Sequence, residues 1–314
     1  MKGIKFSLCV GFSAAAAALI LSATPVGAIT VDGTLDGAYG SPITVQTIDT
    51  GFGDSSYSAG PNSPDANGSE LDAGYGLISG GNLYVFISGN FENNGNKVDV
   101  FLADGRAGQS TLSLPATGSM ANMNGSKFSP SFSATYALTI GDYQGTAYVE
   151  EYDLVANTGG FIGSFSLGPN GGIGSGSPGG SIVYGWNNSN TGGVGGSSGN
   201  PANQAAAAAV TTGLEIQIPL SLLGSPSGSI KVLASQNGGS NDYMSNQLLP
   251  GLPAGTQNLG GGGTYAGAQG QYGYQGFDFS NLDGEYFTIV PEPTTFALVG
   301  VALLGLLAVR SRKS

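Results

Sequence analysis

The chain has 314 residues, of which 40% are apolar and only 9% are charged. Glycine accounts for 56 residues, a level that disfavours long helices and favours turns, strands and loops. Residues 29–290 hold four basic and 19 acidic residues, so we expect no nucleic-acid partner, because nucleic-acid binding depends on Lys and Arg. Solubility accounts for this acidity, and cation binding between acidic loops is the functional alternative.

Few side chains suited to catalysis are present. The chain has no His, and its one Cys is Cys9, close to the N-terminus. Residues 29–290 therefore have no disulfide, no thiol nucleophile and no Ser-His-Asp triad. We expect a protein that is not an enzyme.

The first 28 residues have the pattern of a signal peptide. Lys2 and Lys5 precede an Ala-rich apolar run at 8–21, and Val26-Gly27-Ala28 supplies the small residues of a cleavage site. The pattern predicts a signal helix that signal peptidase removes between Ala28 and Ile29.

Residues 29–290 predict one all-β domain. Short runs rich in β-branched and aromatic residues alternate with Gly, Asn, Ser and Pro. The expected strands are 43–48, 74–78, 82–88, 97–103, 132–140, 145–154, 161–167, 181–186, 214–218, 229–234 and 285–290. This spacing predicts an antiparallel β-sandwich of the jelly-roll type. Flexible Gly-rich surface loops are expected at 168–180, 187–203 and 251–276.

One run predicts a central strand. Gly80-Gly81 precedes it and predicts a tight hairpin turn. The run 82–88 is apolar on both faces, with Leu83, Val85 and Ile87 on one and Tyr84 and Phe86 on the other. A strand of this kind is expected to be covered on both sides.

Three segments of this region resemble the family 9 carbohydrate-binding, DOMON-like sandwich. Val31-Asp32-Gly33-Thr34-Leu35-Asp36, with Tyr39 after it, is similar to the opening strand of that family. Residues 82–87 resemble the strand after its first hairpin, and 213–219 with 222–224 resemble its late strand and turn. Many proteins on this fold bind sugars or calcium, so the resemblance implies a lectin-like alternative with possible calcium dependence.

Glycan binding needs exposed aromatic rings with polar groups beside them. The candidates for such a platform are Trp186, Tyr184, Tyr272 and Tyr274. Trp186 ends a predicted strand beside a loop rich in Gly and Asn, which suits an open site. The alternative is a Trp packed in the core of the sandwich.

The acidic residues suggest two other kinds of site. Weak calcium candidates are Asp32 and Asp36 in the opening turn and Asp99 and Asp104 beside one strand, without EF-hand spacing. Ordinary solvated or turn-capping acids are the alternative, and calcium is the one cofactor left open. A glycoside hydrolase would need two facing carboxylates, and the densest acidic cluster is Glu150, Glu151 and Asp153. We expect this cluster to be a solvated strand face.

A sortase-like pattern occurs at Leu114-Pro115-Ala116-Thr117-Gly118. A sortase signal needs an apolar span and a basic tail directly after it. Here these features come only at 296–313, so we interpret the pattern as a loop.

The C-terminal residues form a more specific pattern. Pro291, Glu292 and Pro293 precede an apolar run at 296–309 and the basic residues Arg310, Arg312 and Lys313. The run predicts a short apolar helix, about 21 Å long against a hydrocarbon core of about 30 Å. The basic end would stay in the cytoplasm. In the order and spacing of these three features, residues 290–314 resemble the PEP-CTERM sorting domain. The resemblance implies recognition by exosortase, a membrane-embedded transpeptidase-like enzyme of diderm bacteria, and removal of the tail near Pro-Glu-Pro.

The chain thus divides into a signal peptide (1–28), a β-sandwich body (29–290) and a sorting tail (291–314). We expect a non-catalytic protein of the cell surface or extracellular matrix, transiently anchored in the inner membrane by its C-terminal helix and associated with exopolysaccharide. Signal peptidase and exosortase are the expected partners during export, and surface polysaccharide is the expected partner afterwards. A glycan-binding module is the alternative function, and a glycoside hydrolase is a less favoured one.

Overall fold

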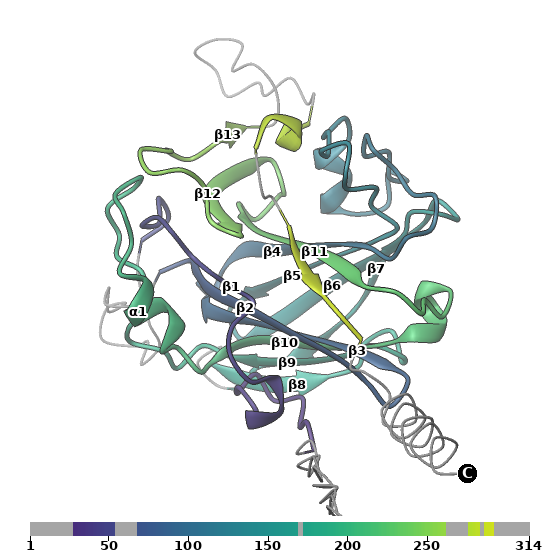
Figure 1. Cartoon of the computed structure of the whole chain (residues 1–314), viewed down its shortest axis with the longest axis horizontal. Helices are drawn as coiled ribbons and strands as arrows, with labels where there is room; N and C mark the ends of the chain where they lie inside the picture. Colours follow the sequence, from purple (N-terminus) through teal and green to yellow (C-terminus); the bar gives the residue numbers. More distant parts are fainter. Residues whose placement is uncertain (1–27, 54–67, 169–171, 262–275, 283–285, 292–314) are drawn as a thin grey trace, which may run out of the picture.

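A computed structural model describes residues 28–53, 68–168, 172–261, 276–282 and 286–291. In these residues two antiparallel sheets face each other and form a β-sandwich (Figure 1). The expected signal helix and C-terminal apolar helix lie outside the described residues. Within the described ranges, no helix is long and apolar enough to cross a membrane.

The first sheet has six strands in the order β1-β2-β3-β10-β9-β8. Their bounds are Thr44–Val45 (β1), Glu70–Ser79 (β2), Asn82–Asn90 (β3), Gly213–Pro219 (β10), Val183–Asn187 (β9) and Ile173–Gly176 (β8). The β2–β3 hairpin turns at Gly80 and Gly81, whose φ angles of 57° and 81° are those that a two-residue type I′ turn requires. Strand β3 lies between β2 and β10, so it is a central strand.

The second sheet has eight strands, in the order β13-β12-β11-β4-β5-β6-β7 with β14 also paired to β11. Their bounds are Gly260–Gly261 (β13), Tyr243–Leu249 (β12), Ile230–Asn237 (β11), Asn94–Ala103 (β4), Tyr136–Tyr143 (β5), Thr146–Asp153 (β6), Thr158–Ser166 (β7) and Phe287–Ile289 (β14). Strand β14 pairs with the first half of β11 and β12 with the second half. The last described strand therefore completes this sheet.

The helices of the described residues are short. They are η1 (Gly37–Tyr39), η2 (Ser119–Met123), α1 (Gln204–Ala208), η3 (Leu220–Leu223) and η4 (Phe279–Asn281). Only α1 is an α-helix, and the side chain of its N-cap residue Asn203 accepts a hydrogen bond from the Ala206 amide. The strands therefore carry the architecture.

The main core lies between the sheets. Alternation along each strand points every second side chain into this space, such as Val98, Val100 and Leu102 of β4, all of which are fully buried. Each such side chain stabilises the fold by roughly 1.5–3 kcal/mol relative to an exposed one.

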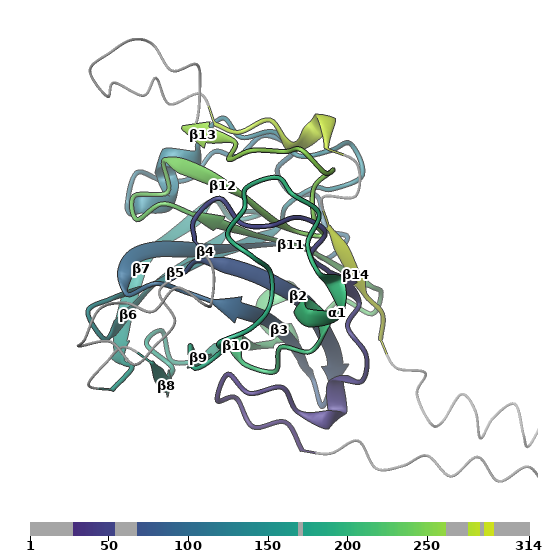
Figure 2. The ribbon, with the colours of Figure 1, turned by 90° about the vertical axis from the view of Figure 1, so that its left-hand side faces the viewer.

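Two further apolar clusters cover the outer faces of the sheets. On the eight-stranded sheet, Phe101 contacts Phe128, and Phe128 stacks on Phe279 with ring centroids 6.1 Å apart. On the six-stranded sheet, Tyr39 from the opening segment lies 5.9 Å from the ring of Phe86. Figure 2 shows the eight-stranded sheet above the six-stranded one, with β13 at the top and the yellow strand β14 at the side. The loops thus form partial outer layers on the sandwich.

All eleven runs predicted as strands overlap a strand of the structure. Strand β8 lies within 168–180 and β13 within 251–276, two stretches expected to be loops. Strand β12 was not predicted because Ser245, Asn246 and Gln247 interrupt its apolar pattern. All three are buried, and Gln247 and Asn246 donate side-chain hydrogen bonds to the carbonyls of Ile48 and Asp49.

Candidate functional site

The opening segment is held by one buried carboxyl. Oε2 of Glu215, on β10, accepts hydrogen bonds from the backbone amides of Asp32 (3.0 Å) and Gly33 (3.2 Å). Its Oε1 accepts a hydrogen bond from the Tyr39 hydroxyl at 2.9 Å. Burial raises the pKa of Glu215 to about 7. Glu215 was not predicted as a structural centre, although an acid between the apolar residues Leu214 and Ile216 is a signal for it.

Asp32 and Asp36 have protein partners in this segment. Oδ1 of Asp32 accepts a hydrogen bond from the Thr34 amide, and Oδ2 of Asp36 accepts one from the Thr30 amide. The Asp32 contact is a local turn contact of the kind that short acidic side chains make, whereas Asp36 reaches back six residues along the segment. Each of the two weak calcium candidates of the opening turn thus has a backbone amide as a partner within the same segment.

Trp186 and Tyr184 are core residues. Both are fully buried, and the Trp186 ring lies 4.6 Å from that of Phe91. A buried ring offers no face to a sugar, so the interpretation of these two residues as an exposed platform is wrong for this structure. Tyr272 and Tyr274, the other two members of the expected platform, lie outside the described residues.

Glu151 is turned into the sandwich. Its carboxylate accepts hydrogen bonds from the hydroxyls of Tyr184 (2.5 Å) and Tyr136 (3.2 Å), which come from strands of different sheets. Burial raises the pKa of Glu151 above its ordinary value. The carboxylate therefore links the two sheets.

Glu150 points to the opposite face and is also buried. Its carboxylate accepts hydrogen bonds from the amides of Ser119 (2.7 Å) and Met120 (3.0 Å) at the start of η2, and from the Tyr152 hydroxyl (2.9 Å). A carboxylate at this position satisfies amides that a helix start leaves without partners. The expectation of a solvated strand face is thus wrong for Glu150, because η2 covers it.

The sortase-like stretch lies directly over this contact. A Cβ at Gly118 would come within 2.4 Å of Glu150 Oε2, and the Thr117 hydroxyl donates a hydrogen bond to the Gly159 carbonyl. The structure gives 115–118 no regular secondary structure, as its interpretation as a loop requires.

Asp99 lies in a buried polar network. Its carboxylate accepts hydrogen bonds from the side-chain amides of Asn241 (2.5 Å) and Asn237 (3.1 Å). Burial outweighs these contacts and raises the pKa of Asp99 to about 6. Both oxygens already have protein donors, so the geometry is that of a structural acid.

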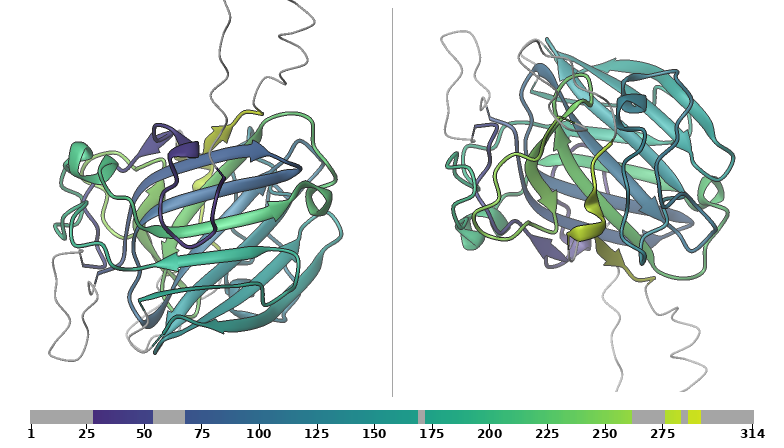
Figure 3. Two further views of the ribbon diagram at one scale, coloured as in Figure 1. Left: turned by 90° about the horizontal axis from the view of Figure 1, so that it is seen from below. Right: turned by 90° about the horizontal axis from the view of Figure 1, so that it is seen from above.

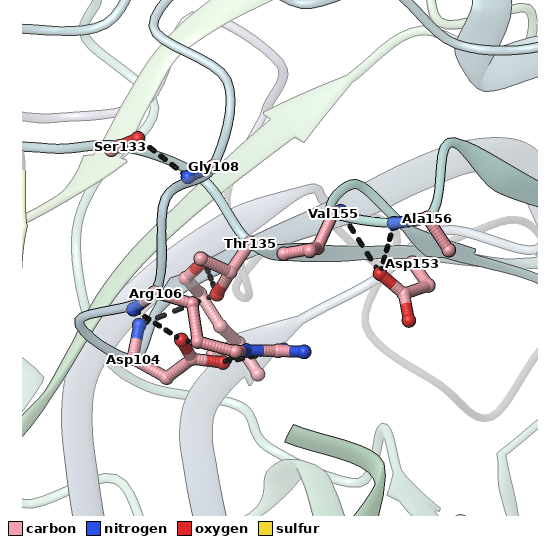
Figure 4. A network of polar contacts seen from close by, with 9 residues as sticks. Asp104, Arg106, Gly108, Ser133, Thr135, Asp153, Val155 and Ala156 are labelled. Carbon is pink, nitrogen blue, oxygen red and sulfur yellow. Dashed lines mark hydrogen bonds and ion pairs between the residues drawn. The ribbon is translucent and has the colours of Figure 1, made fainter. Parts of the chain in front are cut away.

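Asp104 is paired with Arg106 (Figure 4). The Arg106 side chain donates to both Asp104 oxygens, with a shortest distance of 2.6 Å. Figure 4 also shows Asp153, whose Oδ1 accepts hydrogen bonds from the amides of Val155 and Ala156 in the β6–β7 turn. Asp104 is thus neutralised by a neighbouring cation, and Asp153 caps a turn.

The Gly-rich loop at 187–203 is anchored by two carboxylates. Asp72 is the extra residue of a β-bulge in β2, because Leu71 pairs with Gly89 and Ala73 pairs with Ser88. Oδ1 of Asp72 accepts a hydrogen bond from the Val194 amide (2.9 Å), and Oδ1 of Asp49 accepts one from the Gly195 amide (3.1 Å). Burial raises the pKa of Asp72.

The acidic candidates do not meet in one site. In the parts of the chain that the structure describes, no group of three or more acidic, His or Cys side chains is arranged to hold a metal ion. Asp32 and Asp36 lie in the opening segment, whereas Asp99 and Asp104 lie on and after β4 of the other sheet.

The C-terminal end of the body is fixed by β14. A Cβ at Gly74 would come within 2.9 Å of the Phe287 ring, and one at Gly76 within 2.1 Å of Ile289 Cδ1. Phe287 and Ile289 thus fit over two glycines of β2 and belong to the main core. Val290 is 67% exposed, so the chain leaves the core directly after Ile289.

The two ends of the described chain lie close together. In both views of Figure 3, the purple opening segment and the yellow strand β14 lie on the same side of the molecule. Residues that precede and follow the body therefore join it from one side.

Residues 290–313 match the PEP-CTERM protein-sorting motif. The motif implies export, processing by an exosortase and sorting to the cell surface. Of the PEP-CTERM residues, the structure describes Val290 and Pro291, while Glu292, Pro293, Arg310, Arg312 and Lys313 lie outside it. At the other end, Ala28 and Ile29 are described and the rest of the predicted signal peptide is not.

No curated protein and no solved structure matches the chain. The PEP-CTERM match covers the tail, so it concerns the destination of the protein and not the activity of its body. The resemblance of the body to the family 9 carbohydrate-binding sandwich stays an interpretation.

Proposed function

We propose that this protein is a non-catalytic component of the exopolysaccharide matrix, or of the cell surface that bears it, in a diderm bacterium. Its signal peptide directs export, its PEP-CTERM tail holds it briefly in the inner membrane, and exosortase then processes it. The observation that carries the proposal is the position of the motif. It begins at Val290, one residue after the last core strand.

This position makes the sandwich independent of the tail. Every member of the main core lies at or before Ile289. Cleavage near Pro-Glu-Pro would therefore leave the described strands together, and the body would reach the surface as a complete fold.

The chemistry of the body supports a non-catalytic role. The chain has no His, and its one Cys precedes residue 28. Glu150 and Glu151 each accept hydrogen bonds from at least two protein groups, which leaves them poorly suited to act as the acid and base of a glycoside hydrolase.

Cell fractionation tests the proposal. The whole chain, with an epitope inserted within residues 54–67, is expressed in a host that has exosortase, beside a variant that lacks 291–314. We expect the whole chain in the extracellular polysaccharide fraction at the mass of a processed protein, and the truncated variant outside that fraction.

Glu292→Ala should accumulate in the inner membrane at full mass. Asp278→Asn is the matched control, because Asp278 is an exposed acid that precedes the motif. Equal distribution of the whole and truncated chains would contradict the proposal.

A further inference from the structure

Exposed aromatic rings gather on one part of the eight-stranded sheet. Tyr143 at the end of β5 is 52% exposed, Tyr148 on β6 is 39% exposed and Phe161 on β7 is 56% exposed. The rings of Tyr148 and Phe161 are neighbours, with centroids 6.3 Å apart and planes 35° apart. These three residues are called the aromatic shelf below.

The shelf is exposed because the outer layer stops short of it. Tyr148, Glu150 and Tyr152 alternate along β6 and point to the same outer face. The start of η2 covers Glu150, and Tyr152 belongs to the apolar cluster of the outer layer. Tyr148 lies two residues before Glu150, at the edge of this cover.

The strands beside the rings form a floor that contains few large side chains. Lys97, Gly141, Tyr148 and Ser164 are consecutive partners across β4, β5, β6 and β7 and therefore share one face. Gly141 has no side chain, and the methylene stem of Lys97 lies over it, 2.7 Å from where a Cβ would be. The rings thus stand beside a floor of glycine, serine and a lysine stem.

We propose that the aromatic shelf binds the strands of an uncharged polysaccharide; this inference rests on the proposed association with the matrix. Pyranose rings present apolar C–H faces that stack on aromatic rings, while their hydroxyls need polar partners. The shelf offers both, because Tyr143 and Tyr148 carry hydroxyls on their rings and the polar residues Ser164 and Lys97 share their face of the sheet. A few aromatic rings on a polar floor fit a sugar chain better than an apolar protein surface, which requires a continuous apolar patch.

The charge of the site selects an uncharged chain. The carboxylates of the neighbouring strand are engaged elsewhere: Glu150 under η2, Glu151 on two tyrosines between the sheets and Asp153 in a turn. The carboxylates of β6 therefore do not face a sugar chain bound on the shelf. Residues 29–290 carry 19 acids and four bases, so a polyanionic chain would be repelled as it approached.

Affinity electrophoresis tests the site. The whole chain is exported from an exosortase-bearing host, recovered after processing and run through gels that contain hydroxyethylcellulose, xylan, galactomannan, dextran or alginate. We expect at least one uncharged polysaccharide to retard the protein and alginate not to. Replacing Tyr143, Tyr148 and Phe161 together by Ala should weaken the retardation roughly tenfold or more.

Two variants separate ligand contact from folding. Tyr148→Phe keeps the ring and should keep most of the binding. Ile43→Ala removes an apolar side chain of similar exposure directly before β1 of the other sheet, and it should leave binding unchanged. Thermal unfolding of every variant checks the fold.

Two results in the gels would overturn the shelf as the site. One is that no uncharged polysaccharide retards the protein, and the other is that the triple variant is retarded as strongly as the unchanged protein. A dimer that the triple variant dissolves, seen by sedimentation, also overturns it and assigns the face to a second copy. The fractionation experiment depends on the tail, so it can succeed while this one fails.

Discussion

The Tyr39 hydroxyl donates a hydrogen bond to Oε1 of Glu215 at 2.9 Å and so joins the opening segment to a strand 176 positions later. The other oxygen of the same carboxyl receives two backbone amides of that segment. Because β10 is a central strand, this single carboxyl fixes the opening segment across the outer face of the six-stranded sheet. The covered strand β3 depends on that segment for the burial of Phe86.

Removing the Tyr39 hydroxyl should destabilise the fold. Tyr39→Phe leaves Oε1 of Glu215 buried without its donor, which costs about 1–3 kcal/mol in the free energy of unfolding. Urea unfolding followed by circular dichroism measures this loss. Tyr143→Phe is the control, because its ring is half exposed, and its effect should stay within about 0.5 kcal/mol. Equal stability of Tyr39→Phe and the unchanged protein would show that this contact does not hold the segment.

The stability of the body should fall as pH rises from about 5 to about 8. Burial raises the pKa of Glu215 to about 7 and of Asp99 to about 6, and it also raises the pKa of Asp72. The unfolded carboxyls titrate near pH 4, so over this interval the folded state binds more protons than the unfolded state. Their contribution to stability is complete at low pH and is lost as pH passes through the folded pKa values. Tm at constant ionic strength should therefore be higher at pH 5 than at pH 8.

Glu215→Gln isolates one part of this pH dependence. The Gln oxygen can accept the amides of Asp32 and Gly33, while its NH₂ group donates to the Tyr39 oxygen. We expect a smaller fall of Tm between the two pH values. A fall as large as that of the unchanged protein would mean that Glu215 does not titrate in this interval.

The strands could be predicted because their signal is local. Val98, Val100 and Leu102 alternate with other residues along β4, and period-two alternation needs no knowledge of distant partners. The tail was recognisable for the same reason, since Pro-Glu-Pro, an apolar run and a basic end follow one another directly. Strand β12 lacks this alternation, because its buried amides find partners only in distant loops.

The environments of the acids could not be predicted, because they depend on contacts between distant segments. Glu150 looks like a surface residue in its strand, and only η2, about 30 positions earlier in the chain, buries it. Trp186 lies beside a Gly-rich loop, which suggests exposure, yet Phe91 of another segment covers its ring. The exposure of the aromatic shelf likewise depends on where the outer layer of loops ends, which the sequence of the strands does not show.

The one tryptophan of the chain should report a buried environment. Trp186 is fully buried against Phe91, so its native fluorescence should be blue-shifted and resistant to quenching by iodide. Unfolding in urea should shift the emission to the red and expose it to iodide. Efficient quenching in the native state would contradict the packing of this ring.

Trp186→Ala should act through stability and not through a lost ligand contact. Removing so large a buried ring costs about 3–5 kcal/mol in the free energy of unfolding. Trp186→Phe should keep the fold, and in affinity gels it should be retarded as strongly as the unchanged protein. Loss of retardation by a folded Trp186→Phe variant would return this residue to the binding site.

Gly76→Ala should loosen the strand that precedes the sorting motif. The new Cβ would lie 2.1 Å from Ile289 Cδ1 and 2.4 Å from Ile289 Cγ1, so the Ile289 side chain must move from its place over β2. We expect a loss of about 1–3 kcal/mol in the free energy of unfolding, as for other overpacked cores. Limited proteolysis should then cleave faster near Phe287. Gly228→Ala is the matched control, because no atom lies within 4 Å of its Cβ position. If Gly76→Ala resists protease as Gly228→Ala does, the contact between Ile289 and β2 does not fasten the end of the body.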